Sequence, residues 1–244
     1  MFRSTAIACA LMSTAAHASA QTTLNFDALA HGQMIVPSLF ASSNVTIEAE
    51  NFRVANAMPI AFDTTLFATA DPDLTGPPWG GGNLPQDMVL GNVIIVPENL
   101  VDANNDGIVD SPDDEGARPA GDLTFRFAEA IDSFGFDVVD IEGVVQELTT
   151  VDFYVGGALL GTLDFADLTT PGADFYDPTI SFGNNSINRV APVTAADFGG
   201  TRFDTVIIRL GGSGAFDNIV TTIPAPTSGA LLVLSGLVAS RRRR

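Results

Sequence analysis

Short runs of β-type residues recur along this chain, separated by clusters of glycine, proline, asparagine and aspartate. In the run DLTFRF, Leu123, Phe125 and Phe127 share one face, and Thr124 and Arg126 share the other. A period of two residues is that of a β-strand with one buried face, and no long helical periodicity is present. We predict strands over residues 22–26, 44–48, 88–96, 123–127, 133–140, 150–154, 158–165, 202–210 and 215–221.

These runs predict the fold class. Gly156-Gly157 separates two of them in VDFYVGGALLGTLDF and can supply the positive φ of a tight turn, so we expect a hairpin there. About nine strands without a tandem repeat indicate an all-β fold, an antiparallel β-sandwich of jelly-roll type. We expect most of the seventeen phenylalanines to fill the space between its sheets.

Residues 63–121 differ from the rest of the chain. They are rich in aspartate, proline and glycine, and their main apolar run is MVLGNVIIV. We interpret them as a long acidic loop region inserted into the sandwich. A connection of this length must be ordered by something or remain mobile, and metal binding can supply that order.

Within this region, residues 102–113 (DANNDGIVDSPD) have the spacing of a calcium-binding loop. Such a loop of twelve residues takes oxygen ligands at positions 1, 3, 5, 7, 9 and 12 and a glycine at position 6. Gly107 occupies the glycine position. The ligand positions hold Asp102, Asn104, Asp106, the carbonyl of Ile108, Asp110 and Asp113. We predict a structural Ca²⁺ here, and the alternative is a solvated acidic loop with a chance Asn-Asp-Gly turn.

The pattern DxNxDGxxDxxD is similar to the loops of dockerin modules, because Asp113 replaces the glutamate that ends an EF-hand loop. A dockerin needs two such repeats, so we interpret this as a single calcium loop between strands. Ser111 and Pro112 can begin one helical turn as N-cap and first helical residue, and Gly116 and Pro119 prevent a second full helix.

Two further acidic sets are candidates for metal binding. Asp71 and Asp73, with Asp63, could form a second site with the calcium loop, although Asp-Pro-Asp is also a common turn. Asp217 lies in the last predicted strand and Asp27 directly after the first. The ends of a jelly roll tend to lie side by side, so this pair could meet, and a solvated strand edge is the alternative.

The body of the chain also carries a resemblance. FDTT, DPDL, LGNVIIVPEN, DDEGARPAGDLTFRF, FGFDVVDIEG and GSGAFDNIV resemble a group of uncharacterised exported bacterial proteins that often carry PEP-CTERM tails. The resemblance implies a jelly-roll module similar to galactose-binding-like carbohydrate-binding domains. Those modules keep a structural calcium where Asp27 and Asp217 would meet here.

Both ends have the pattern of export signals. Residues 1–20 (MFRSTAIACALMSTAAHASA) combine one arginine, an apolar stretch and a small-x-small ending, so we predict a signal peptide cut after Ala20. Residues 223–244 (IPAPTSGALLVLSGLVASRRRR) contain a short apolar helix that is followed by terminal arginines.

This tail resembles the PEP-CTERM sorting signal, in which an exosortase is thought to recognise the tail and cleave near Pro-x-Pro. The motif here is Pro224, Ala225 and Pro226, with alanine where the family most often has glutamate, and the basic cluster is Arg241, Arg242, Arg243 and Arg244. A plain C-terminal membrane anchor is the alternative. The sandwich domain is expected over residues 21–222.

Composition excludes several chemistries. Removing both ends leaves six arginines against 29 acidic residues, a net charge of −23, and the chain has no lysine. Such a surface repels nucleic acid and attracts divalent cations, although acidic surfaces are also common in salty habitats. The body has no cysteine and one histidine, His31, which excludes thiolate catalysis and metal sites built from histidine and cysteine, and the absence of lysine excludes Schiff bases.

The sequence therefore predicts a protein that is not an enzyme: a calcium-stabilised cell-surface or extracellular-matrix protein with no catalytic residues and no organic cofactor. Its expected partners are an exosortase-type processing enzyme and, before processing, the inner membrane. The alternative is a carbohydrate-binding module that recognises extracellular polysaccharide through Trp79, Tyr154, Tyr176 or exposed phenylalanines. A glycosidase that uses two carboxylates is a third hypothesis.

Overall fold

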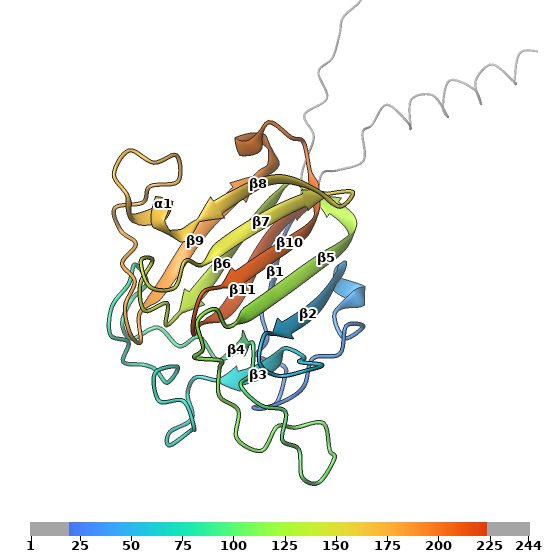
Figure 1. Ribbon diagram of the computed structural model, residues 1–244, viewed down its shortest axis with the longest axis vertical. Helices are drawn as coiled ribbons and strands as arrows, with labels where there is room; N and C mark the ends of the chain where they lie inside the picture. Colours follow the sequence, from blue (N-terminus) through green and yellow to red (C-terminus); the bar gives the residue numbers. More distant parts are fainter. Residues whose placement is uncertain (1–19, 224–244) are drawn as a thin grey trace, which may run out of the picture. The chain divides into compact units, whose positions relative to one another are not determined.

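Two antiparallel sheets face each other in the computed structural model, which describes residues 20–223 (Figure 1). One sheet has the order β3-β4-β11-β6-β9, with β1 also paired to β11, and the other has the order β2-β5-β10-β7-β8. From β5 to β11 the chain passes repeatedly between the sheets, so the predicted jelly-roll sandwich is confirmed. The strands are β1 (Ala20–Leu24), β2 (Val45–Asn51), β3 (Ile60–Asp63), β4 (Asn92–Ile95), β5 (Gly121–Ile131), β6 (Ser133–Val139), β7 (Thr150–Val155), β8 (Ala158–Asp164), β9 (Ile187–Thr194), β10 (Phe203–Leu210) and β11 (Ala215–Ile223), and the short helices are η1 (Ala41–Ser43), α1 (Phe165–Thr169) and η2 (Ala195–Phe198).

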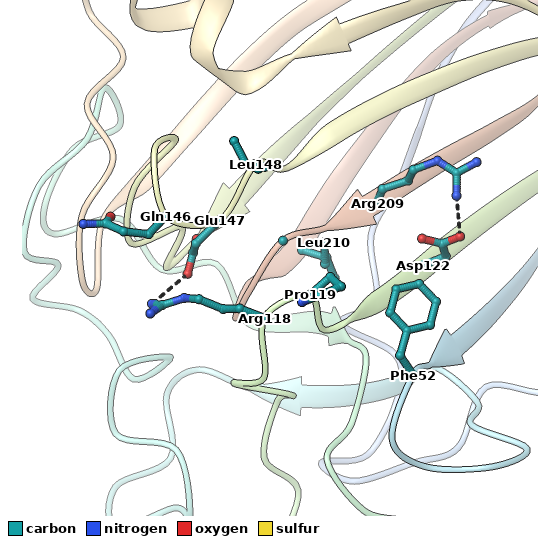
Figure 2. Close-up of a pocket in the computed structure, with 10 residues that line it drawn as sticks. Phe52, Arg118, Pro119, Asp122, Gln146, Glu147, Leu148, Arg209 and Leu210 are labelled. Carbon is teal, nitrogen blue, oxygen red and sulfur yellow. Dashed lines mark hydrogen bonds and ion pairs between the residues drawn. The ribbon is translucent and has the colours of Figure 1, made fainter.

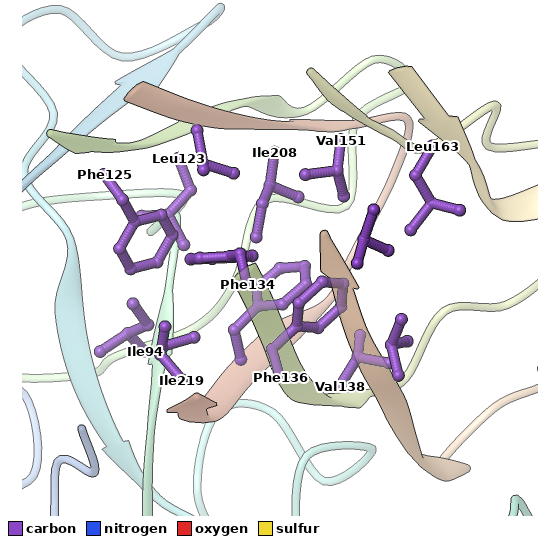
Figure 3. Close-up of a cluster of buried hydrophobic side chains, with 14 of the residues drawn as sticks. Ile94, Leu123, Phe125, Phe134, Phe136, Val138, Val151, Leu163, Ile208 and Ile219 are labelled. Carbon is purple, nitrogen blue, oxygen red and sulfur yellow. The ribbon is translucent and has the colours of Figure 1, made fainter. Parts of the chain in front are cut away.

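The main apolar core fills the space between the sheets, as Figure 3 shows. Nine phenylalanines are buried in it, so the expected role of this residue type is confirmed. Leu123, Phe125 and Phe127 of β5 all belong to this core. Phe134 of β6 packs edge-on against Phe125 from the opposite sheet, with ring centroids 5.3 Å apart. The alternation visible in DLTFRF therefore defines the face that joins the sheets.

A second apolar cluster covers the outer face of the sheet that contains β4. Ile94 belongs to the main core, whereas its neighbours Val93 and Ile95 belong to the second cluster, so β4 is buried on both faces. Leu74 and Trp79, from the loop region 63–121, pack there. This region is therefore held against the sheet by apolar side chains, which order it without a metal ion.

Two strands were not predicted, and each has a local reason. All but the last residue of β3 are buried, so the strand shows no alternation. β9 contains Pro192, which normally interrupts a strand. β9 lies at the edge of its sheet, and the pairing shifts register beside Gly135, whose missing side chain leaves room for the ring of Pro192. Proline is tolerated at such an edge irregularity.

The remaining strands overlap the predicted runs, but β4 covers only the second half of the run predicted over 88–96, and β5 continues four residues beyond the end predicted at 127. β7 and β8 form the predicted hairpin, with positive φ at Gly156 (56°) and Gly157 (81°). β11 continues to Ile223, the first residue assigned to the tail.

Residues 1–19 of the predicted signal peptide and the sorting motif with its arginines, 224–244, lie outside the described residues. None of the helices between residues 20 and 223 has the length and apolar character that crossing a bilayer requires.

Candidate metal-binding sites

The predicted calcium loop lies between β4 and β5 and turns tightly around Gly107, whose φ is +85°. Asp102 accepts hydrogen bonds through Oδ1 from the amide of Asp106 (3.1 Å) and through Oδ2 from the amide of Gly107 (2.8 Å). Asp106 Oδ1 accepts from the amide of Ile108 (2.9 Å). The Asn-Asp-Gly segment is thus a real turn, organised by the side chains predicted to bind calcium.

Two further predicted ligands close the same loop. Asn104 Oδ1 accepts from the amide of Asp106 (3.1 Å), and Asn104 Nδ2 donates to Asp106 Oδ2 (2.9 Å). Asp110 Oδ2 accepts from the amide of Ala103 (3.1 Å). These carboxylates are solvent-exposed and lie on one short segment, so a cation can reach them without displacing core residues.

The loop is fixed to the domain at its C-terminal half. Ile108 forms a β-bridge with Gln33, and the amide of Val109 donates to the carbonyl of Gly32 (2.8 Å). Val109 is buried in the second apolar cluster. Gly32 has a φ of +78°, and a Cβ there would lie 2.4 Å from the carbonyl oxygen of Val109. Backbone contacts therefore determine the position of the loop, and they leave room only for glycine at position 32.

The segment after the loop is extended and not helical. The predicted helical turn beginning at Ser111 is wrong: Asp114 forms a β-bridge with Pro97. The amide of Glu98 donates to the carbonyl of Asp113 (3.0 Å), and the amide of Glu115 donates to that of Val96 (2.9 Å). Pairing with the chain that leaves β4 satisfies backbone groups that a helix would otherwise use.

Asp113, the twelfth residue of the loop, belongs to a different group of acids. One oxygen each from Asp71, Asp113 and Asp114 lies within 4.8 Å of the others, and this is the one such trio of acidic, histidine or cysteine side chains within residues 20–223. Of the candidate acids Asp63, Asp71 and Asp73, Asp71 alone belongs to this trio, so the suggested second set comes together with the calcium-loop segment only in part. Asp114 was missed by sequence reasoning, although the adjacent acids in DSPDDEG were a signal. Asp63 binds its own turn, accepting from the amide of Thr65 (2.9 Å).

A further buried acid lies in β11, the central strand of its sheet. Asp217 is 1% exposed, and neither of its carboxylate oxygens has a hydrogen-bond partner among the described residues. It lies opposite Asp137, which accepts 2.7 Å hydrogen bonds from Arg189. Burial, and then the charges of Asp137 and Asp27, raise the pKa of Asp217 to about 7. Asp27 is close enough for its charge to contribute to this shift, and Asp217 is buried in a central strand, so the alternative of a solvated strand edge does not describe it.

The aromatic residues proposed for sugar binding have different environments. Trp79 is 3% exposed and its Nε1 donates to the carbonyl of Met88 (2.7 Å), so it anchors a loop and offers no platform. Tyr154 lies on the outer face of its sheet, where its hydroxyl contacts Asp152 and Arg209. Tyr176 is 38% exposed.

A cavity of about 380 Å³ opens between the start of β5, the end of β10 and the loop after β6. Figure 2 shows Phe52 and Asp122 on one side of it and Glu147 on the other. Arg209 Nη1 binds Asp122 at 2.8 Å, and Arg118 contacts Glu147 at 3.4 Å. Asp122 Oδ1 is buried and has no hydrogen-bond partner among residues 20–223, and burial raises the pKa of Asp122 and of Glu147. Paired charges beside one aromatic ring are groups that can recognise a polyhydroxylated ligand.

The chain is similar to known proteins in structure and not in sequence. No family model and no curated protein sequence match the chain. It resembles the crystal structure of the K2 cleaved adhesin domain of Lys-gingipain, with 11% identity and a TM-score of 0.36 over 84% of this chain and 100% of that one. It also resembles the K1 cleaved adhesin domain of Lys-gingipain from Porphyromonas gingivalis W83, with 12% identity and a TM-score of 0.26 over 72% and 97% of the two chains. Likeness at this level carries no functional information.

Proposed function

We propose that this chain is a non-catalytic, calcium-stabilised protein of the cell surface or extracellular matrix. The observation that carries the proposal is the loop 102–110, in which exposed side-chain oxygens are gathered around Gly107 in the spacing that calcium uses. Extracellular calcium-binding modules have dissociation constants of about 10⁻⁴ to 10⁻³ M, and we expect an affinity in this range.

The proposal includes the cellular location of the protein. The pattern of residues 1–20 supports export, and the Pro224, Ala225, Pro226 motif with its terminal arginines supports sorting by an exosortase-type enzyme after transient anchoring in the inner membrane. Mass spectrometry of the native protein should find Gln21 at the N-terminus and a C-terminus near Pro226. An intact tail on surface material would favour a plain anchor.

Calcium titration by calorimetry tests the loop site. Residues 21–223 contain both sheets and both apolar clusters, so this body can be expressed by itself. We expect Asp106→Ala to abolish one binding event, because it removes a ligand and the cap on the Ile108 amide. Asp87→Ala, an exposed acid elsewhere in the same region, is the control and should leave the heats unchanged. Equal heats from wild type and Asp106→Ala would remove the loop from the proposal.

Carbohydrate binding is the second candidate function, and the cavity beside Phe52 favours it. The ring of Phe52 is 47% exposed and lies near two arginine–carboxylate pairs, which resembles the mixture of stacking and hydrogen-bonding groups in sugar sites. A glycan array with wild type and Phe52→Ala tests this. Binding that Phe52→Ala removes would support it, and turnover of a model glycoside would contradict the non-catalytic assignment.

A further inference from the structure

We infer that Asp71, Asp113 and Asp114 hold a buried calcium ion at a site separate from the loop 102–110. The trio combines acids from two connections that are distant in sequence, and its oxygens converge to within 4.8 Å. Asp71 and Asp114 are each only 7% exposed. The site does not depend on calcium binding by the loop.

An unpartnered oxygen points to a missing ligand. Asp71 Oδ1 accepts hydrogen bonds from the amides of Asp73 (3.0 Å) and Leu74 (3.2 Å), so the turn does not use its other oxygen, Oδ2. That Oδ2 atom is buried and has no partner in the described part of the chain. A buried polar oxygen without a partner costs about 1–3 kcal/mol, and more when it is charged. A cation in the trio would satisfy it.

The charges of the trio are not neutralised by the protein. None of the ion pairs among residues 20–223 includes Asp71, Asp113 or Asp114. Burial, and then the charge of Asp71, raises the pKa of Asp114 well above its usual range. Burial and the same neighbour raise the pKa of Asp113 to about 6. Three adjacent carboxylates at neutral pH require either protons or a bound cation.

The number and kind of ligands favour calcium. Ca²⁺ takes six to eight hard oxygen ligands in flexible geometry, carboxylates among them. Mg²⁺ demands near-ideal octahedral geometry, gives up its water ligands reluctantly and is usually held by one or two carboxylates. A largely buried site that offers three carboxylates therefore fits Ca²⁺ better than Mg²⁺.

An ion in this position would join three parts of the domain. Asp71 belongs to the connection that contains Trp79, and Asp113 and Asp114 belong to the connection that leads into β5. Asp114 Oδ2 also accepts from the amide of Gly214, directly before β11 (2.5 Å). Calcium would thus fix both loops that cover the outer face of the sheet to the strand at its centre.

Calcium titration with a conservative variant tests the site. Asp71→Asn keeps the oxygen that binds the turn amides and removes one charge from the trio. We expect it to bind one Ca²⁺ per chain fewer than wild type, whereas Asp106→Ala should retain the ion of the trio. Because the variant also relieves repulsion, its melting temperature in calcium-free buffer should be above that of wild type, and calcium should raise it less. A residue with only a structural role would lower the melting temperature in both buffers.

Asp114→Asn is the second variant and should lose the same ion. If Asp71→Asn and Asp114→Asn both fold and bind as many Ca²⁺ ions per chain as wild type, the inference is overturned. Protons on the three carboxyl groups would then account for their burial. If Asp71→Asn and Asp114→Asn lose an ion and Asp106→Ala does not, the trio stands and the loop site of the proposed function fails. If Asp106→Ala loses an ion and the two trio variants do not, the loop site stands and the trio fails.

Discussion

Asp140 is a buried acid whose protonation should influence stability. Its Oδ1 accepts from the amide of Asn185 (2.5 Å), and its Oδ2 accepts from the hydroxyl of Ser213 (3.3 Å). Burial raises its pKa to about 7, from about 3.9 in the unfolded chain. The folded state therefore holds its proton more tightly. The resulting stabilisation is complete below about pH 4 and is lost as the pH rises through about 7.

The neutral variant Asp140→Asn tests this dependence. Asparagine has nearly the same side-chain shape as aspartate and tolerates the positive φ of this position (61°). In calcium-free buffer we expect wild type to lose stability between pH 5 and pH 8, and the variant to lose about 1–3 kcal/mol less. Urea unfolding at both pH values measures the difference, with the exposed Asp174→Asn as control. Parallel pH curves for wild type and Asp140→Asn would show that this carboxyl does not titrate as described.

At the scale of elements, the second apolar cluster determines the position of the loop region 63–121. Trp79 fills it from the loop, and Gly76 lies against its ring, where a Cβ would come within 2.5 Å. Such contacts explain how a long segment becomes ordered although its apolar and polar residues do not alternate. Metal ions would then act at its edges, at the loop 102–110 and at the acidic trio.

Trp79→Ala should therefore destabilise the protein by about 3–5 kcal/mol, the usual cost of deleting a buried aromatic side chain. Phe67→Ala, at a residue of the same region that is 84% exposed, is the matched control and should change stability by less than about 0.5 kcal/mol. Chemical denaturation of both variants gives these values. Equal effects would mean that the cluster contributes little to folding.

For the whole molecule, calcium should add to the stability of a sandwich that already has its own core. With a dissociation constant of about 10⁻⁴ to 10⁻³ M, 10 mM Ca²⁺ should stabilise the folded state by about 1–3 kcal/mol for each site. Thermal unfolding and limited proteolysis with and without a chelator measure this. We expect the first cleavages in chelator to fall between residues 97 and 120. Identical melting and cleavage in both buffers would contradict a stabilising role for calcium.

The sequence alone determined the sandwich because a strand with one buried face has an apolar residue at every second position, as in DLTFRF. It also determined the Gly156-Gly157 hairpin and the turn at Gly107, where positive φ restricts the residue type. β3 and β9 have no such recognisable pattern. β3 is buried on both faces, and β9 contains Pro192, which it tolerates only through a register shift with its neighbour.

The tertiary structure decided what non-local contacts determine. Spacing placed Asp113 in a loop of twelve residues, but its carboxylate lies with Asp71 and Asp114, because the segment 113–115 pairs with the chain after β4. Trp79 became a core residue for the same reason: the loop region folds over a face of the sheet. Contacts between residues far apart in sequence leave no periodic trace, so only the folded chain reveals which acids share a site.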